Sequence, residues 1–348
     1  MKILAVDVGD RTQDIMLYDP DINIENCVKA VLPTPSSVYA GRISKLANPG
    51  NKSIFISGDC IGGGKLSKAI ADAAARGRVC MTQQAARTIS YKNEEIEKLG
   101  IRITDEFNAD CEVVFTESDL GVFENFLSNY DICGIDAVCY AVQDHGARWG
   151  IANREYRFEV FKKMLKKHNK LMDLSITGYD QIDSSFYRFK SLFNSLKRQK
   201  EKVLIMDTAQ CALLGCTADD SVKNLDDYMI INLGNGHATF AIMRGGRIIS
   251  YMEHHTRYLH DGQKLKDYIV RFADGNLESD EVFNDGGSGA VIFETVGFEN
   301  LKKIVVTGPW RSLVKNTSLE YYFASPAGDM MMSGPAGLVS AYSKVEKI

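Results

Sequence analysis

The sequence lacks a long apolar run, a strong charge of one sign and any closely spaced cysteine pair. No stretch approaches the roughly 18 uncharged apolar residues of a membrane-spanning helix. The first apolar run meets Asp7 too soon to be the core of a signal peptide, so we expect a cytoplasmic protein. Forty-one Lys and Arg against 45 Asp and Glu leave a net charge of −4. Neither nucleic acid nor a membrane is therefore an expected partner.

Cysteine spacing argues against two further classes of protein. Eight cysteines are scattered along 348 residues, which is typical of reduced thiols in a chain long enough to bury its own core. No Cys-x-x-Cys occurs, and no Cys-x3-Cys-x2-Cys run could hold an iron–sulfur cluster locally. A disulfide scaffold and radical chemistry at a local cluster are both disfavoured.

The patterns that are present predict an α/β protein of about two domains or lobes. Apolar runs at 2–9 and 15–18, joined by a short polar loop, predict a β-hairpin. Further strands are expected at 53–57, 136–142 and 203–206, and helices at 65–75 and 154–172. The basic face of the second helix, around Lys162, Lys163, Lys166 and Lys167, is most simply a solvated surface.

A second strand pair repeats the N-terminal design. Strands expected at 229–233 and 238–243 flank a Gly-rich turn, and a third, at 247–251, follows Gly245-Gly246. This internal similarity suggests two related lobes, each contributing one turn to a shared cleft.

The first turn has the composition of a phosphate-binding loop. Gly9 allows a sharp bend, so backbone N–H groups and the Thr12 hydroxyl could surround phosphate oxygens. Asp7, at the strand end, could hold a hydrated Mg²⁺ ion. The alternative is a turn with no ligand. The residues expected to bind the nucleotide here are Gly9, Asp10, Arg11, Thr12 and Gln13.

Two later segments are further candidates for nucleotide binding. The turn after strand 229–233 could bind further phosphate oxygens, and Gly308, after a strand expected at 304–307, could let a base or ribose lie against the backbone. His237 could also touch a phosphate directly. The residues expected in the second turn are Asn232, Gly234, Asn235, Gly236, His237 and Thr239.

These three segments, in this order, resemble the nucleotide-binding framework of the actin, sugar-kinase and heat-shock-70 chaperone superfamily. The small-residue segment 207–215 is similar to the helix that connects the lobes there. The resemblance implies two lobes of ribonuclease-H-like topology, with ATP and Mg²⁺ in a central cleft. We expect lobe I at 1–215, lobe II at 216–328 and a C-terminal helix at 329–348 returning to lobe I.

Two departures accompany the resemblance. Asn232 stands where the superfamily usually has Asp, and His237 where Thr or Ser is usual, which puts Mg²⁺ affinity and turnover in question. More narrowly, segments 58–64, 143–146, 235–237 and 254–256 resemble an uncharacterised family often labelled a pyruvate formate-lyase activating enzyme. That label implies a three-cysteine cluster motif, which this sequence lacks.

Candidate catalytic and acceptor-binding residues lie outside the turns. Asp144 follows a predicted buried strand and could act as a base with His145 as its partner, or simply cap a turn before Gly146. The run Gly62, Gly63 and Gly64 before a helix is a candidate acceptor site or a packing turn.

Two adjacent histidines are a further candidate substrate contact. His254 and His255 end the second meander, with His260 close by. A zinc site is less favoured, because adjacent strand residues point to opposite faces. The loop from Asp285 to Gly289 is either an ordinary loop or a border of the nucleotide, and 330–337 is expected to be core and turn.

The expected function is an ATP-dependent phosphotransferase or ATPase acting on a small-molecule or protein acceptor that the sequence does not identify. The alternative is a non-catalytic module whose lobes close on a nucleotide. A third possibility, an iron–sulfur ATPase that activates a partner enzyme, would need cysteines such as Cys60 or Cys80 near a dimer axis. The sequence does not specify an oligomeric state.

Overall fold

The computed structural model describes residues 1–48, 52–148 and 150–347. They form two compact units, each built from separate chain segments. Unit 1 comprises Met1–Leu32, Asp136–Thr177 and Leu204–Ile348, and unit 2 comprises Pro33–Ile135 and Gly178–Val203. These compact units do not test the expected division into lobes. Lobe I at 1–215, lobe II at 216–328 and the C-terminal helix at 329–348 therefore stay a prediction.

The first sheet of unit 1 begins with the predicted hairpin. Its strand order is β3-β2-β1-β8-β9. The pairing of β1 with β2 is antiparallel and ends at Val8 opposite Gln13, which leaves residues 9–11 as the tight turn. The strands are β1 (Lys2–Val8), β2 (Thr12–Tyr18), β3 (Val28–Pro33), β8 (Ile135–Val142) and β9 (Val203–Asp207).

The second sheet of unit 1 repeats this order with one strand added at an edge. It runs β13-β12-β11-β10-β14-β15, with β10, β11 and β12 an antiparallel meander and β14 parallel to β10. Three consecutive strands followed by two later ones is the ribonuclease-H-like arrangement, which confirms the predicted fold class. The strands are β10 (Tyr228–Leu233), β11 (His237–Arg244), β12 (Arg247–His255), β13 (Gly289–Ile292), β14 (Ile304–Thr307) and β15 (Tyr322–Phe323).

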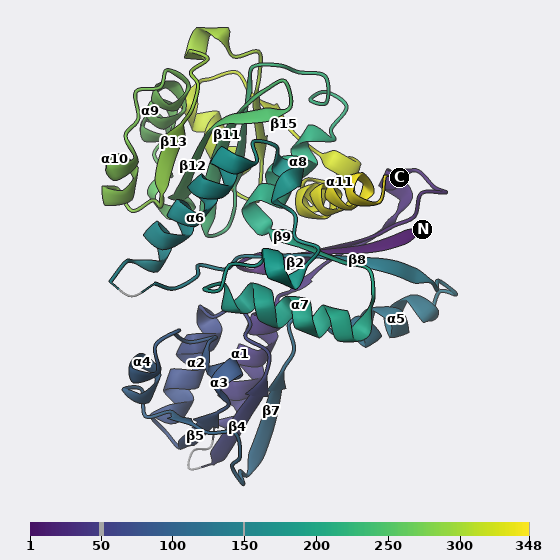
Figure 1. The fold of residues 1–348 in the computed structure, drawn as a ribbon, viewed down its shortest axis with the longest axis vertical. Coiled ribbons are helices and arrows are strands. Elements are labelled where there is room, and N and C mark those ends of the chain that lie inside the picture. Colours follow the sequence, from purple (N-terminus) through teal and green to yellow (C-terminus); the bar gives the residue numbers. More distant parts are fainter. Residues whose placement is uncertain (49–51, 149, 348) are drawn as a thin grey trace. The chain divides into compact units, whose positions relative to one another are not determined.

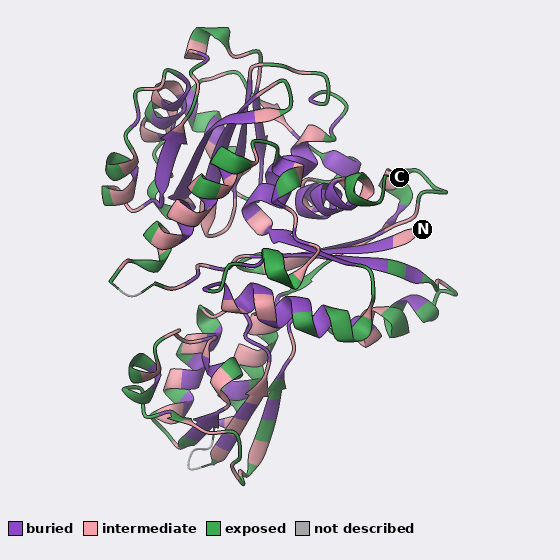
Figure 2. Cartoon of the chain, viewed as in Figure 1, coloured by how far each residue is buried: buried purple, intermediate pink, exposed green. Residues whose placement is uncertain are grey.

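Helices α8 (Thr208–Thr217) and α11 (Ser333–Glu346) pack against each other in unit 1 (Figure 1). Two glycines allow the close approach: a β-carbon on Gly215 would clash with the carbonyl of Ser333, and one on Gly337 with that of Cys211. Figure 2 shows both helices largely buried, and their side chains join the main apolar core. The small-residue helix expected from about residue 207 is therefore present as α8.

Three other helices complete unit 1: α6 (Asn153–Lys167), α9 (Gly262–Ala273) and α10 (Ser279–Asn284). Helix α6 is shorter than the predicted 154–172. The backbone becomes extended at His168, and the carbonyl of Asn169 accepts a hydrogen bond from the backbone N–H of Ile248 in β12. Pairing with the sheet thus ends the helix.

Unit 2 is a small parallel α/β unit. Its sheet has the order β6-β5-β4-β7, with all its pairs parallel. The strands are β4 (Ser53–Gly58), β5 (Arg78–Met81), β6 (Arg102–Ile103) and β7 (Cys111–Phe115). The helices are α1 (Pro35–Leu46), α2 (Lys65–Ala74), α3 (Gln83–Ala86), α4 (Asn93–Glu97), α5 (Leu120–Ser128) and α7 (Tyr187–Gln199). No helix within the described ranges is long and apolar enough to cross a membrane.

Candidate functional site

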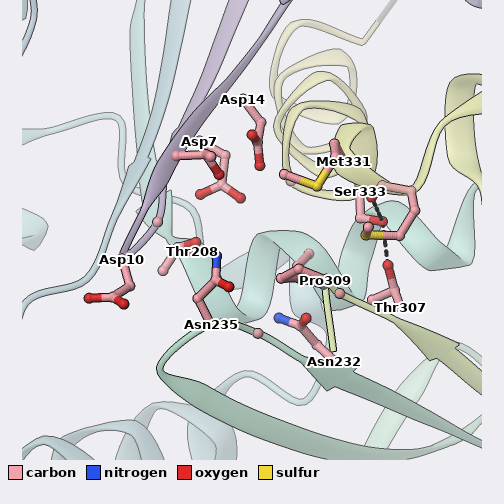
Figure 3. A pocket seen from close by; sticks show the side chains of 17 residues that line it. Asp7, Asp10, Asp14, Thr208, Asn232, Asn235, Thr307, Pro309, Met331 and Ser333 are labelled. Carbon is pink, nitrogen blue, oxygen red and sulfur yellow. Dashed lines mark hydrogen bonds between the residues drawn. The ribbon is translucent and has the colours of Figure 1, made fainter. Parts of the chain in front are cut away.

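Unit 1 contains a pocket formed by segments that are distant in the sequence (Figure 3). The β1–β2 turn and the β10–β11 turn contribute to its lining, as do the starts of α8 and α11 and the residues after β14. The lining residues are Asp7, Gly9, Asp10, Thr12, Asp14, Thr208, Ala212, Asn232, Gly234, Asn235, Thr307, Gly308, Pro309, Met330, Met331, Ser333 and Gly334.

The two glycine turns face each other. In the first, the Gly9 N–H donates to the carbonyl of Thr12 at 2.9 Å, and in the second the Gly234 N–H donates to that of His237 at 3.0 Å. A β-carbon added at Gly236 would lie 3.7 Å from the β-carbon of Asp10. The expected meeting of the two turns is therefore present within unit 1.

Glycine is required at two of these positions by close backbone approach. A β-carbon on Gly234 would lie 2.8 Å from the carbonyl oxygen of His237. Gly308 has a φ of +94°, and a β-carbon there would clash with the backbone carbonyl of Leu233. Larger residues would push the second turn away from β14, so these glycines determine the shape of this wall of the pocket.

Two carboxylates on the first hairpin each have one oxygen without a hydrogen-bond partner among the described residues. Asp7 is only 7% exposed, and Oδ1 of both Asp7 and Asp14 is buried without a hydrogen-bond partner among the described residues. Burial and the nearby Asp14 raise the pKa of Asp7 well above its usual value, with the Thr208 hydroxyl opposing this. Burial likewise raises the pKa of Asp14 to about 7, with Thr12 opposing and Asp329 adding to it. A divalent cation would relieve both.

The donor chemistry fits Mg²⁺, which prefers oxygen ligands and usually takes one or two carboxylates together with water and phosphate. No cluster of three or more His, Cys, Asp or Glu side chains suited to a metal ion occurs within the described ranges. Protein side chains would thus fill only part of the coordination shell, leaving room for phosphate oxygens.

A buried arginine that the sequence analysis missed lies near the turns. Arg157 of α6 donates from Nη1 and Nη2 to Asp207 at 2.6 and 3.0 Å, and from Nε to Oε1 of Glu253 at 3.2 Å. Its Nη1 also donates to the carbonyl of Asp144 at 3.1 Å. The network links β9 with β12 and with the segment that follows β8, so it ties the two sheets of unit 1 together.

Glu253 extends this network to the second turn. Nδ1 of His237 lies 3.1 Å from Oε1 of Glu253, and its ring centroid lies 4.6 Å from that of His255 and 5.7 Å from that of His145. Burial would raise the pKa of Glu253, but Arg157 and His237 hold it well below its usual range. An ionised, oriented carboxylate therefore faces the imidazole of the turn.

Asp144 and His145 follow β8, as expected, but neither lines the pocket. Asp144 is buried, and its Oδ1 accepts a hydrogen bond from the backbone N–H of Gly146 at 2.9 Å, the turn contact named as the alternative to catalysis. Their catalytic role remains a proposal.

His254 and His255 lie on opposite faces of β12. In buried His254, Nε2 lies 3.0 Å from Oδ2 of Asp285 and Nδ1 faces the carbonyl of His255. His255 donates from Nδ1 to the carbonyl of Gly286 at 2.6 Å. Burial lowers the pKa of both histidines, although the acceptors around each ring oppose this. The 285–289 loop thus holds the histidines and does not line the pocket.

The triglycine run belongs to unit 2. A β-carbon on Gly62 would lie 3.1 Å from Nη2 of Arg188, which forms a bidentate pair with Glu117 at 2.8 and 2.9 Å. Gly63 lies against the carbonyl of Thr88, and Gly64 directly precedes α2 with a φ of +62°. Packing therefore accounts for two of the three glycines, and acceptor binding stays a proposal.

About half of the residues that line the pocket are among the predicted nucleotide and metal contacts. Of the predicted nucleotide contacts, Arg11, Gln13, Gly236, His237 and Thr239 do not line it. The lining residues that were missed as contacts come from β2 and from segments far along the chain: Asp14, Thr208, Ala212, Thr307, Pro309, Met330, Met331, Ser333 and Gly334. The segment 330–337, expected to be core and turn only, contributes four of them.

The repeated ribonuclease-H-like sheets and the facing glycine turns form the actin-like fold that the resemblance to the actin, sugar-kinase and heat-shock-70 superfamily implies. Residues 61–313 match the model of the family described as "Putative pyruvate format-lyase activating enzyme (DUF1786)". The match covers more than two thirds of the chain, and the chain belongs to this family.

Solved structures with a similar fold are distant in sequence. A protein described as "a putative N-acetylmannosamine kinase" from Listeria monocytogenes is 12% identical with a TM-score of 0.41, covering 99% of this chain and 100% of its own. The activator of 2-hydroxyisocaproyl-CoA dehydratase from Clostridium difficile, with bound ADPNP, is 9% identical with a TM-score of 0.38, covering 100% and 96%.

A third similar structure, from Bacteroides thetaiotaomicron, is described as having an actin-like ATPase fold and unknown function. It is 10% identical with a TM-score of 0.38, covering 96% of this chain and 95% of its own. No curated protein matches the sequence. Identities this low transfer neither ligand nor activity.

Proposed function

We propose that this protein binds ATP with Mg²⁺ in the pocket of unit 1 and acts as a phosphotransferase or ATPase on a small-molecule or protein acceptor. The observation that carries the proposal is the pair of glycine turns facing each other beside the buried carboxylate of Asp7, whose Oδ1 has no hydrogen-bond partner among the described residues. Phosphoryl transfer depends mainly on positioning and charge neutralisation, and these groups can supply both.

Each group of residues that lines the pocket has a distinct role in this proposal. The backbone of Gly9 to Thr12 and that of Gly234 and Asn235 would hold phosphate oxygens. Asp7 would hold Mg²⁺ directly or through water, and Gly308 would let the ribose or base lie against the backbone. The bound cation would supply the positive charge that neutralises the phosphates.

Acceptor activation is assigned to Asp144 with His145. Asp144 lies at the carboxyl end of β8, beside Arg157 and the second turn, where a base could meet an acceptor hydroxyl or a water molecule. Gly62, Gly63 and Gly64 of unit 2 and the pair His254 and His255 remain candidates for contact with the acceptor. The ring nitrogens of the two histidines already face protein acceptors, which favours a positioning task for them.

Asn232 favours a second candidate function, a nucleotide-gated module without turnover. Its side chain lines the pocket but contributes no charge, where the superfamily usually has a carboxylate. Such a module would bind the nucleotide, change shape and act on a partner protein. Asn232→Asp should then raise the Mg²⁺ dependence of nucleotide binding, and an unchanged dependence would count against this alternative.

The decisive experiment is calorimetric titration of the full chain with ATP, ADP and a non-hydrolysable ATP analogue, with Mg²⁺ or with EDTA, followed by phosphate-release assays. We expect nucleotide binding that Mg²⁺ strengthens. Asp7→Asn should remove the Mg²⁺ effect while Asp21→Asn, an exposed carboxylate outside the pocket, should retain it. Failure of every nucleotide to bind would refute the proposal, and binding without phosphate release or transfer would favour the gated module.

A further inference from the structure

Asp14 is placed directly opposite Asp7 on the first hairpin. The two residues are register partners in the antiparallel pairing of β1 with β2. Opposite residues on one face of such a pair have β-carbons about 4.5–5.5 Å apart, within the span of a single coordinated cation. Both residues line the pocket, and Figure 3 shows both side chains directed into it.

Each carboxylate offers an oxygen that nothing satisfies within the described part of the chain. Oδ1 of Asp7 and Oδ1 of Asp14 are buried and lack hydrogen-bond partners, and Asp7 as a whole is more than nine-tenths buried. Neither takes part in an ion pair among the described residues, and the buried Arg157 is paired with Asp207 and Glu253. Burying two unpaired carboxylates side by side is costly unless a cation joins them.

The surrounding groups add oxygen ligands and no positive side chain. Thr12 and Thr208 line the same wall, and Asp10 lies at the pocket's exposed end. Asn232, from the second turn, brings an amide. The negative charge that the second turn does not provide is therefore present on the first hairpin, at position 14.

We propose that Asp14 is a second carboxylate ligand, which with Asp7 forms a hard divalent-cation site on the β1–β2 hairpin. The site takes Mg²⁺ or Mn²⁺, and water or phosphate oxygens complete the coordination. This inference rests on the proposed function for one point only, the nucleotide phosphate that the cation later binds. The two carboxylates can hold the ion before any nucleotide arrives. In this site, Asp14 supplies the negative charge that the amide of Asn232 does not.

The test is Mn²⁺ binding to the full chain without nucleotide, measured by the electron paramagnetic resonance signal of free Mn²⁺. We expect one site in the wild type and an affinity at least about tenfold weaker in Asp14→Asn. Asp14→Glu, which keeps the carboxylate, should lose much less. Asn232→Asp in the Asp14→Asn background should recover part of the affinity, and Asp21→Asn should bind like the wild type.

The outcomes separate this inference from the proposed function, because ATP binding is measured on the same variants in EDTA. If Asp14→Asn binds Mn²⁺ as tightly as the wild type, the inference is wrong even where ATP binds. If ATP does not bind but Mn²⁺ binding depends on Asp14, the inference stands and the proposed function fails. Circular dichroism of each variant must match the wild type, and equal loss in Asp14→Asn and a correctly folded Asp14→Glu would also overturn the inference.

Discussion

At the scale of single residues, Arg157 is a buried cation held by several partners. It is fully buried, and its guanidinium donates to two carboxylates and one backbone carbonyl. Such a group is stable only while all its partners remain, because the loss of one leaves an uncompensated buried charge. Its value to the fold lies in joining β9 and β12 to the segment that follows β8.

Replacing this arginine should destabilise the protein strongly. Arg157→Met keeps the apolar length of the side chain but leaves Asp207 and Glu253 without their cation, so we expect the free energy of unfolding to fall by about 3–5 kcal/mol in urea titrations. Lys163→Met, at an exposed position of the same helix, is the matched control and should stay within about 0.5 kcal/mol of wild type. A loss below about 1 kcal/mol in Arg157→Met would show that the network contributes little.

A second residue-scale prediction concerns pH. Burial, with His237 and Arg257 nearby, lowers the pKa of His255, against the opposing effects of Gly286 and Glu253. Its folded pKa is thus below its unfolded pKa, so the unfolded state binds more protons as the pH falls through about 6.5. Stability from this group is present above that pH and declines below it.

Urea unfolding at about pH 7.5 and about pH 5.5 tests this, since the two values bracket the ordinary histidine pKa. We expect the decrease in stability on acidification to be smaller in His255→Gln, which can still donate to Gly286. An equal or larger decrease in the variant would contradict the assigned direction. Comparing the variant with the wild type removes the contributions of Asp7, Asp14 and His254.

At the scale of elements, the crossing of α8 and α11 sets the position of two pocket walls. Thr208 begins α8 and Ser333 begins α11, and both line the pocket. The helices approach closely at Gly215 and Gly337, where backbone lies against backbone. A shift of one helix relative to the other therefore changes the distance between pocket residues that lie more than a hundred positions apart in the chain.

Gly215→Ala should separate these helices. The added methyl group would clash with the carbonyl of Ser333, so we expect a loss of about 1–3 kcal/mol or more in the free energy of unfolding and weaker nucleotide binding. Gly41→Ala, in helix α1 with nothing near the new methyl group, is the control and should be neutral or stabilising by about 0.4–1 kcal/mol. If both variants behave alike, the helix crossing is less tight than described.

At the scale of the whole molecule, both ribonuclease-H-like sheets belong to one compact unit, and the triglycine run belongs to the other. Unit 1 contains two sheets and unit 2 one, and each unit has an apolar core of its own. The proposal therefore assigns the nucleotide to residues of unit 1 alone and makes no demand on unit 2 for binding.

Hydrogen exchange measured by mass spectrometry tests that assignment. With ATP analogue and Mg²⁺, we expect slower exchange in peptides covering residues 7–14, 232–237 and 307–310, because bound phosphates occupy their N–H groups. Asp7→Asn should show less protection in the same peptides. Protection that appears only at 58–64 would place the nucleotide in unit 2 and overturn the assignment.

Much of the framework could be predicted because it depends on local patterns. Apolar runs on either side of Gly9 and Gly234 are sufficient to predict two hairpins, and the turn residues themselves carry the phosphate-binding chemistry. Asp14 was missed because nothing in a single strand marks which face will meet α11. Arg157 was missed because, in a helix rich in Lys, one buried cation looks like the solvated ones beside it.

The amino-acid sequence by itself determined the strands, the glycine turns and the carboxylate at position 7, since backbone stereochemistry and apolar spacing act over a few residues. Only the tertiary structure decided which distant segments share a wall with them: Thr208, Thr307 and Ser333 come together because helices and sheets bury their apolar faces cooperatively. That burial also decided which charges lose water, and so which acidic and basic groups require a partner.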